Sequence, residues 1–155
     1  MKTLSKFLGV CSLLLLLASC GSDEGDPLVG SEISISDIQG NWNAIRAVFD
    51  IAGTGASQSI DIVEEGGTVT LQIQSNGRFT LTVTQQGESP EVSQGQMSFD
   101  EDLLVVEFDD SSGDWEYFSI QSSSSTLSIS GPAEFDFDGD GTEEAATADL
   151  DFVRA

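Results

Sequence analysis

Alternation of apolar and polar residues in the middle of the chain constrains the fold more than any other feature. Residues 69–73 place Val, Leu and Ile at every second position, and residues 79–83 do the same with Phe, Leu and Val. Thr and Gln fill the positions between, so each run has one apolar and one polar face. The Asn76-Gly77 pair predicts a two-residue hairpin turn with positive backbone angles. Together these features predict an antiparallel sheet that faces water on one side.

The same period of two recurs along the rest of the chain, with turns rich in Asp, Ser and Gly between the runs. Short strands connected in sequence can close into a barrel, and closure removes the exposed sheet edges. We therefore expect an all-β fold, an eight-stranded antiparallel up-and-down barrel within residues 36–155. Its strands are predicted at residues 41–52, 69–74, 79–84, 92–99, 103–108, 115–121, 126–130 and 146–153.

The first twenty residues have the pattern of a secretory leader. Two lysines precede an apolar run at residues 7–18, and Leu-Ala-Ser-Cys follows at residues 17–20. The run is shorter than the ~20 residues that span a bilayer. Its end resembles the lipobox of bacterial lipoproteins, which implies removal of residues 1–19, a lipid on Cys20 and an anchor in the bacterial outer membrane or at the cell surface. The alternative is an ordinary secretory signal followed by a chance cysteine.

Charge excludes several classes of function. The chain has 5 Lys and Arg against 27 Asp and Glu, no His, and a net charge of −22. Such a surface repels phosphate backbones, so we expect no nucleic-acid binding. Both lysines and Cys11 lie in the predicted leader, which leaves no residue for His, Lys or thiol catalysis. Because no carboxylate pair is marked as buried, we expect no enzymatic activity. The acidic, Gly-rich start of residues 20–35 predicts a flexible tether.

The start and end of the predicted barrel carry a second resemblance. Residues 38–42, Ile-Gln-Gly-Asn-Trp, resemble the Gly-x-Trp opening of lipocalins, and the chain closes on a strand that ends at Arg154. The resemblance implies a lipocalin-like lipoprotein domain in which Arg154 lies across Trp42 as a structural cation–π pair. The alternative reading of Trp42 is a core aromatic residue of some other barrel or sandwich.

Two uses of such a barrel follow. The lipocalin resemblance implies binding of a small hydrophobic ligand in the lumen. The alternative is a non-enzymatic cell-surface structural or adhesion module, which would contact a partner protein or glycan through Trp115 or Tyr117 if these are exposed. An eight-stranded barrel is narrow enough for its own side chains to fill it. The side chains expected to point inward are Leu71, Ile73, Phe79, Leu81, Met97, Phe99, Val106, Phe108, Phe118 and Ile120.

An acidic loop near the end of the chain is a candidate calcium site. Calcium is bound by about six to eight oxygen ligands. Residues 136–144 resemble the Asp-x-Asp-Gly-Asp-Gly loops between strands of integrin-type extracellular repeats. That resemblance implies a structural calcium ion that stabilises the last hairpin. A polar turn in a generally acidic protein is the alternative. The expected ligands are Asp136, Asp138, Asp140, the carbonyl of Thr142, and Glu144.

Overall fold

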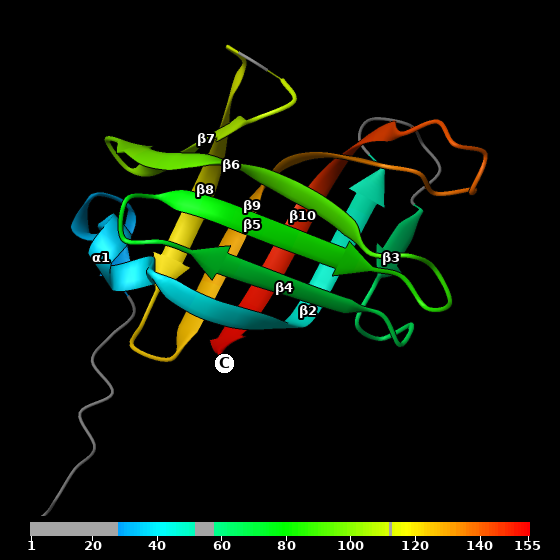
Figure 1. Ribbon diagram of the computed structural model, residues 1–155, viewed down its shortest axis with the longest axis horizontal. Helices are drawn as coiled ribbons and strands as arrows, with labels where there is room; N and C mark the ends of the chain where they lie inside the picture. Colours follow the sequence, from blue (N-terminus) through cyan, green and yellow to red (C-terminus); the bar gives the residue numbers. More distant parts are fainter. Residues whose placement is uncertain (1–27, 52–57, 112) are drawn as a thin grey trace, which may run out of the picture.

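The computed structural model describes residues 28–51, 58–111 and 113–155. The predicted leader, Cys20 and the first part of the predicted tether lie outside the described residues, as does Ala52 at the end of the first predicted strand. The described chain contains a 3-10 helix, one short α-helix and ten strands (Figure 1). They are β1 (Leu28–Val29), η1 (Gly30–Glu32), α1 (Ile35–Ile38), β2 (Gly40–Ile51), β3 (Ser59–Asp61), β4 (Thr68–Ile73), β5 (Arg78–Thr84), β6 (Glu91–Asp100), β7 (Leu103–Phe108), β8 (Trp115–Ser122), β9 (Thr126–Phe135) and β10 (Glu144–Arg154).

Eight of these strands form a closed ring. Each of β4 to β7 pairs antiparallel with the next strand in sequence. β10 pairs with both β9 and β2, and β2 pairs with β4. The β8–β9 pairing closes the ring. In Figure 1, β4, β5 and β6 cross in front of β8, β9 and β10. The predicted eight-stranded antiparallel up-and-down barrel is therefore confirmed, with β1 and β3 as short additions on β8 and β2.

Alternation along the strands separates the two faces of the barrel. All ten side chains predicted to point inward belong to the core, although Leu81, Phe99 and Phe108 are only partly buried. In β4, every second residue from Val69 to Ile73 is at most 3% exposed, and the residues between are exposed. Burial of this apolar face stabilises the fold by about 25 cal/mol per Å² removed from water.

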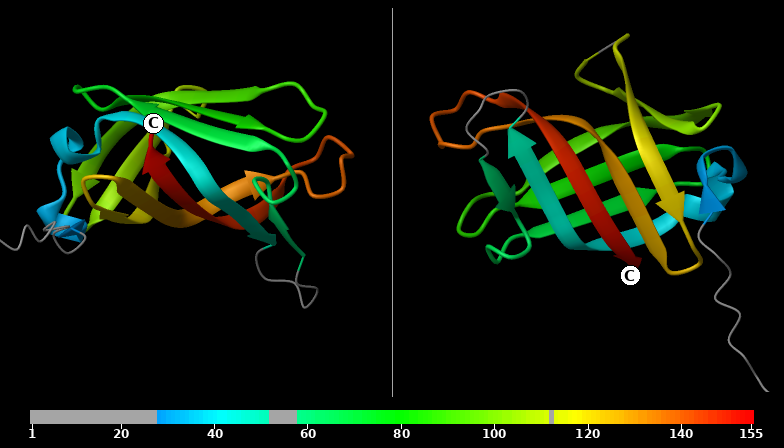
Figure 2. Two further views of the ribbon diagram at one scale, coloured as in Figure 1. Left: turned by 90° about the horizontal axis from the view of Figure 1, so that it is seen from below. Right: turned by 180° about the vertical axis from the view of Figure 1, so that it is seen from behind.

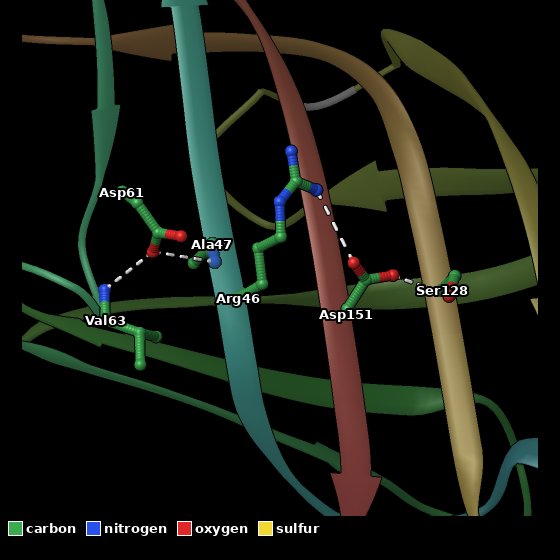
Figure 3. Close-up of polar contacts among 6 residues, drawn as sticks. All are labelled: Arg46, Ala47, Asp61, Val63, Ser128 and Asp151. Atoms are coloured by element: carbon green, nitrogen blue, oxygen red, sulfur yellow. Dashed lines mark hydrogen bonds and ion pairs between the residues drawn. The ribbon is translucent and has the colours of Figure 1, made fainter.

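A β-bulge bends β2. Arg46 pairs with Asp151 and Ala44 with Phe152, so Ile45 is the extra residue and is 59% exposed. Beyond the bulge β2 no longer pairs with β4 and pairs with β3 instead. The carboxylate of Asp61 at the end of β3 accepts hydrogen bonds from the backbone N–H groups of Ala47, at 3.2 Å, and Val63, at 3.0 Å (Figure 3). Asp61 thus satisfies backbone N–H groups at the point where β2 changes its pairing partner from β4 to β3.

The short helix α1 lies at one end of the barrel, which we call the helical end (Figure 2). Ile38 at the end of α1 and Trp42 in β2 are both fully buried. The indole Nε1 of Trp42 donates to the carbonyl oxygen of Ile38 at 2.8 Å. We call the opposite end, formed by residues 62–67, 85–90, 109–111, 113–114 and 136–143, the loop end. The tryptophan therefore covers the core at the helical end and satisfies its own polar group.

The guanidinium of Arg154 ties the helical end together. Its Cζ lies 4.2 Å from the centroid of the Trp42 ring. Its nitrogens donate to the carbonyl oxygens of Ser124, Gln39 and Asp37 at 2.9, 2.8 and 3.1 Å. The structure thus brings together the two residues for which the lipocalin resemblance implies a cation–π pair. The same side chain joins the end of α1 to the β8–β9 turn.

Gly40 makes room for this arrangement. It has a φ of +132°, and a Cβ atom there would lie 2.7 Å from Nη1 of Arg154. A side chain at residue 40 would be strained by the backbone angle and would displace the guanidinium.

Two local predictions are wrong. The turn after β4 spans three residues, with a hydrogen bond from Gly77 N to Gln74 O and a positive φ at Gly77 but not at Asn76. It is therefore a type I turn followed by a left-handed glycine. Residues 28–35 belong to the expected flexible tether, yet they contain β1 and η1, and Ile33 is 5% exposed in the core. The sequence offers little signal for this short ordered segment, because Ile33 is an apolar residue among polar ones.

We expect Arg154→Met to lower the free energy of unfolding by roughly 1–3 kcal/mol, because it removes three hydrogen bonds and a cation–π contact while keeping most of the side-chain volume. Urea unfolding at neutral pH measures the change. Arg46→Met is the matched control, since it breaks a single exposed ion pair and should cost less than about 1 kcal/mol. Equal losses in the two variants would contradict the role given to Arg154.

Candidate binding surfaces

Side chains fill the interior of the barrel. An apolar cavity among the described residues of the lumen measures about 50 Å³. Ligand pockets usually enclose about 300–1,000 Å³, so the cavity is several times too small for such a ligand unless side chains move. Three of its lining residues, Leu81, Phe108 and Leu150, are only half-buried. The complete lining consists of Leu71, Phe79, Leu81, Met97, Leu104, Val106, Phe108, Phe118, Ile129 and Leu150.

Toward the loop end, β8 and β9 separate. These strands pair only from Ser119 to Ser122 of β8, and Figure 2 (right) shows them diverging beyond that point. The ring of Phe118 occupies the wedge, where it lies against Gly131, and a Cβ at Gly131 would come within 2.4 Å of it. The absence of a side chain at Gly131 therefore lets an aromatic ring seal the wedge.

Acidic residues at strand ends lie around the loop end. Partial burial, followed by the negative charge of Glu134, raises the pKa of Glu116. Burial also raises the pKa of Glu143, and the charges of Glu134, Glu91 and Asp136 add to the effect. Neighbouring negative charges raise each other's pKa, so these carboxylates lie close enough to form one negatively charged region. A ligand with a carboxylate, such as a fatty acid, would meet repulsion on entering the barrel from this end.

A groove of about 400 Å³ crosses the outer face of β6, β7 and β8. Two cross-strand rows build it. Gln96, Glu107 and Trp115 form one row, and Ser98, Val105 and Tyr117 form the next. Asp100, which pairs with Leu103, and Phe99 complete the lining. We call this feature the outer groove.

Aromatic side chains are the main exposed apolar surface of the outer groove. Trp115 is 61% exposed and Tyr117 is 43% exposed. Val105 lies between them in the groove lining and is only 7% exposed, although it does not belong to the interior core. The groove therefore has its own small apolar floor on the outside of the barrel. Aromatic rings that stay exposed over such a floor are typical of recognition sites.

The charged groups of the outer groove are acidic. Glu107 and Asp100 line it, and no basic residue does. Arg78 pairs with Gln96 on the neighbouring strand, but its guanidinium binds both oxygens of Asp109, at 2.8 and 2.6 Å. That pair holds the pKa of Asp109 below its usual range, chiefly through the hydrogen bonds from Arg78. Arg78 therefore does not neutralise the two groove carboxylates.

A second, more polar groove of about 350 Å³ lies on the outer face of β8, β9, β10 and β2. Three serines line it, and Asp151 joins Ser128, at 2.7 Å, to Arg46, at 3.4 Å (Figure 3). These contacts pair Arg46 and Asp151 with each other, and Asp149 is the third charged residue of the lining. The groove contains no aromatic side chain among its lining residues.

The acidic loop brings three of the predicted calcium ligands together. One carboxylate oxygen from each of Asp136, Asp138 and Asp140 lies within 4.8 Å of the others. The oxygens of Asp136 accept from the N–H groups of Gly139 and Gly141, both at 2.8 Å, and these bonds lower its pKa, with the Gly141 bond as the largest cause. The three carboxylates are hard oxygen donors that could hold a metal ion.

The other two predicted ligands are placed differently. Glu144 is not part of this group, and its Oε2 accepts a hydrogen bond from Phe137 N at 3.2 Å. Thr142 N donates to Asp140 Oδ1 at 2.8 Å. The ring of Phe137 packs edge-on against Phe135, with centroids 4.9 Å apart, so the loop is attached to the core at the loop end.

Sequence reasoning missed the carboxylates of the outer groove, although it singled out Trp115 and Tyr117. Glu107 and Asp100 become neighbours of these rings only through the register of three strands. The available sequence signal was that both carboxylates occupy the polar, outward-facing positions of their strands.

Within the described ranges, no helix has the length and apolar character needed to cross a membrane. Comparison with known proteins gives no match to a family model, a curated protein or a solved structure.

Proposed function

We propose that this chain is a non-enzymatic, lipid-anchored protein of the bacterial envelope whose lipocalin-like barrel is a rigid scaffold for binding on its outer surface. The contrast between inside and outside carries the proposal. The apolar cavity lined by described lumen residues measures about 50 Å³, whereas the outer groove measures about 400 Å³ and has two exposed aromatic side chains. The groove therefore has the size and the anchoring residues that this cavity lacks.

The packed core suits this use. Strand pairing around the whole ring fixes the backbone of β6, β7 and β8, so the rings of Trp115 and Tyr117 stand on a rigid surface. Rigid aromatic side chains lose little conformational entropy when they bind a partner. The Trp42–Arg154 pair at the helical end supports the lipocalin-like assignment.

A small apolar ligand in the lumen is the second candidate function. The cavity is lined only by apolar side chains, and the half-buried Leu81, Phe108 and Leu150 are the ones that would have to move. The acidic groups at the loop end disfavour an anionic ligand.

Cell binding distinguishes the two functions. A secreted form with Cys20→Ala is mixed with cells of the producing bacterium, and the fraction that sediments with them is measured. We expect Trp115→Ala with Tyr117→Ala to abolish sedimentation, because both anchors of the outer groove are removed. Ile45→Ala, which truncates an exposed apolar residue on β2, is the control and should sediment normally.

Two results would contradict binding at the outer groove. One is unchanged sedimentation of the double aromatic variant. The other is saturable binding of the neutral fluorophore N-phenyl-1-naphthylamine that Leu81→Trp weakens and the aromatic variant does not, which would favour the lumen.

The proposed anchor has its own test. Cys20→Ala removes the only thiol that follows the predicted cleavage site. We expect the wild-type chain in the membrane fraction and the variant in the periplasm or medium, because acyl chains contribute roughly 0.8 kcal/mol per buried methylene to anchoring. Immunoblots of the separated fractions measure this. A variant that stays with the membranes would contradict lipidation at Cys20.

We further propose that the acidic loop binds calcium and stabilises the β9–β10 hairpin. Extracellular modules bind calcium with dissociation constants of about 10⁻⁴–10⁻³ M. Calcium at about 10 mM should therefore raise the melting temperature by roughly 3–10 °C relative to EDTA. Asp138→Asn with Asp140→Asn should remove this difference. Asp110→Asn with Asp114→Asn removes the same charge from another exposed loop and should retain it. An equal calcium response in both double variants would indicate charge screening alone.

A further inference from the structure

We infer that the outer groove binds an extended peptide segment of a partner protein with two basic side chains four residues apart. This inference rests on the proposed surface function and specifies its ligand. Its basis is the combination of two exposed aromatic rings, two carboxylates and a surrounding surface without a spare positive charge.

The described part of the chain has three basic side chains, and each of them interacts with groups of the same chain. Arg46 pairs with Asp151, Arg78 with Asp109, and Arg154 lies on Trp42 and donates to backbone carbonyls. Both lysines precede Cys20 in the sequence. The field around the groove is therefore negative, and it attracts cations and repels anions.

The aromatic rings of the outer groove suit a cation as well. The face of an aromatic ring is the negative end of its quadrupole, and a guanidinium or ammonium group placed over it is attracted. Trp115 lies in the same cross-strand row as Glu107. A cationic side chain at this point can contact an indole face and a carboxylate together. A neutral sugar would gain the ring contact but would not gain from either carboxylate.

The spacing of the carboxylates selects an extended peptide over a single small cation. Asp100 pairs with Leu103, four residues before Glu107 on β7. At about 3.3 Å per residue, these two positions are roughly 13 Å apart along the strand. Side chains four residues apart on one face of an extended peptide have the same separation. Val105 lies between the two positions, where it offers an apolar floor to the middle of the peptide.

Trp115 is also a built-in reporter. The chain has two tryptophans, and Trp42 is fully buried while Trp115 is 61% exposed. The purified full-length protein, in micelles of an uncharged detergent, is titrated with acetyl-Arg-Ser-Gly-Ser-Arg-amide and its tryptophan emission is followed. Trp115→Phe keeps an aromatic face and reports Trp42 alone. The citrulline form of the peptide has the same shape without charge, and cellopentaose represents a neutral sugar.

We expect saturable binding of the arginine peptide that weakens as salt rises from 20 to 500 mM. Asp100→Asn with Glu107→Gln should weaken it by about three- to thirtyfold. Glu64→Gln with Glu88→Gln removes the same charge from exposed loops elsewhere and should leave affinity nearly unchanged. An emission change that persists in Trp115→Phe would place the binding event near Trp42 and overturn the inference.

Equal binding of the citrulline peptide, or preference for cellopentaose, would overturn the cationic ligand and leave the outer groove as a binding site. Failure of every probe to change Trp115 emission would also overturn the inference. The proposed surface function then depends on the sedimentation experiment alone: it stands if the aromatic variant loses cell binding and fails if that variant binds normally.

Discussion

Closure of the eight-stranded ring is the constraint on which the rest of the structure depends. The β8–β9 pairing that closes the ring runs from Ser119 to Ser122 of β8. Once it closes, every second side chain must face a lumen only wide enough to be filled. The others must face water. An aromatic residue on the outer face, such as Trp115, therefore stays exposed to solvent, where a partner can contact it.

The two ends of the barrel solve different problems. At the helical end, Trp42 covers the core and Arg154 covers Trp42, so the last strand is tied to the segment that enters the first one. At the loop end, β8 and β9 diverge, and the ring of Phe118 against Gly131 seals the interior instead of backbone pairing. The acidic groups gathered there add a charge barrier to the steric one.

Strand positions and the inward set could be predicted from the sequence because period-two alternation is a local signal that tertiary contacts reinforce. Details that depend on several strands could not. The bulge at Ile45 depends on β2 changing partner from β4 to β3, and the outer groove depends on the register of β6, β7 and β8. The contact of Arg154 with Trp42 was accessible only through a family resemblance, since residues 112 positions apart carry no local signal of contact.

The engagement of every described arginine also bears on how the domain resists proteases. Trypsin-like proteases cut after Lys or Arg, and beyond Cys20 the sequence offers them only Arg46, Arg78 and Arg154. All three lie within paired strands, in β2, β5 and β10. A protease must pull several residues into its own active site, so cleavage requires these strands to open first. The folded barrel is accordingly a poor substrate for trypsin-like proteases. Because both lysines precede Cys20, the barrel also contains no lysine for amine-directed reagents to modify.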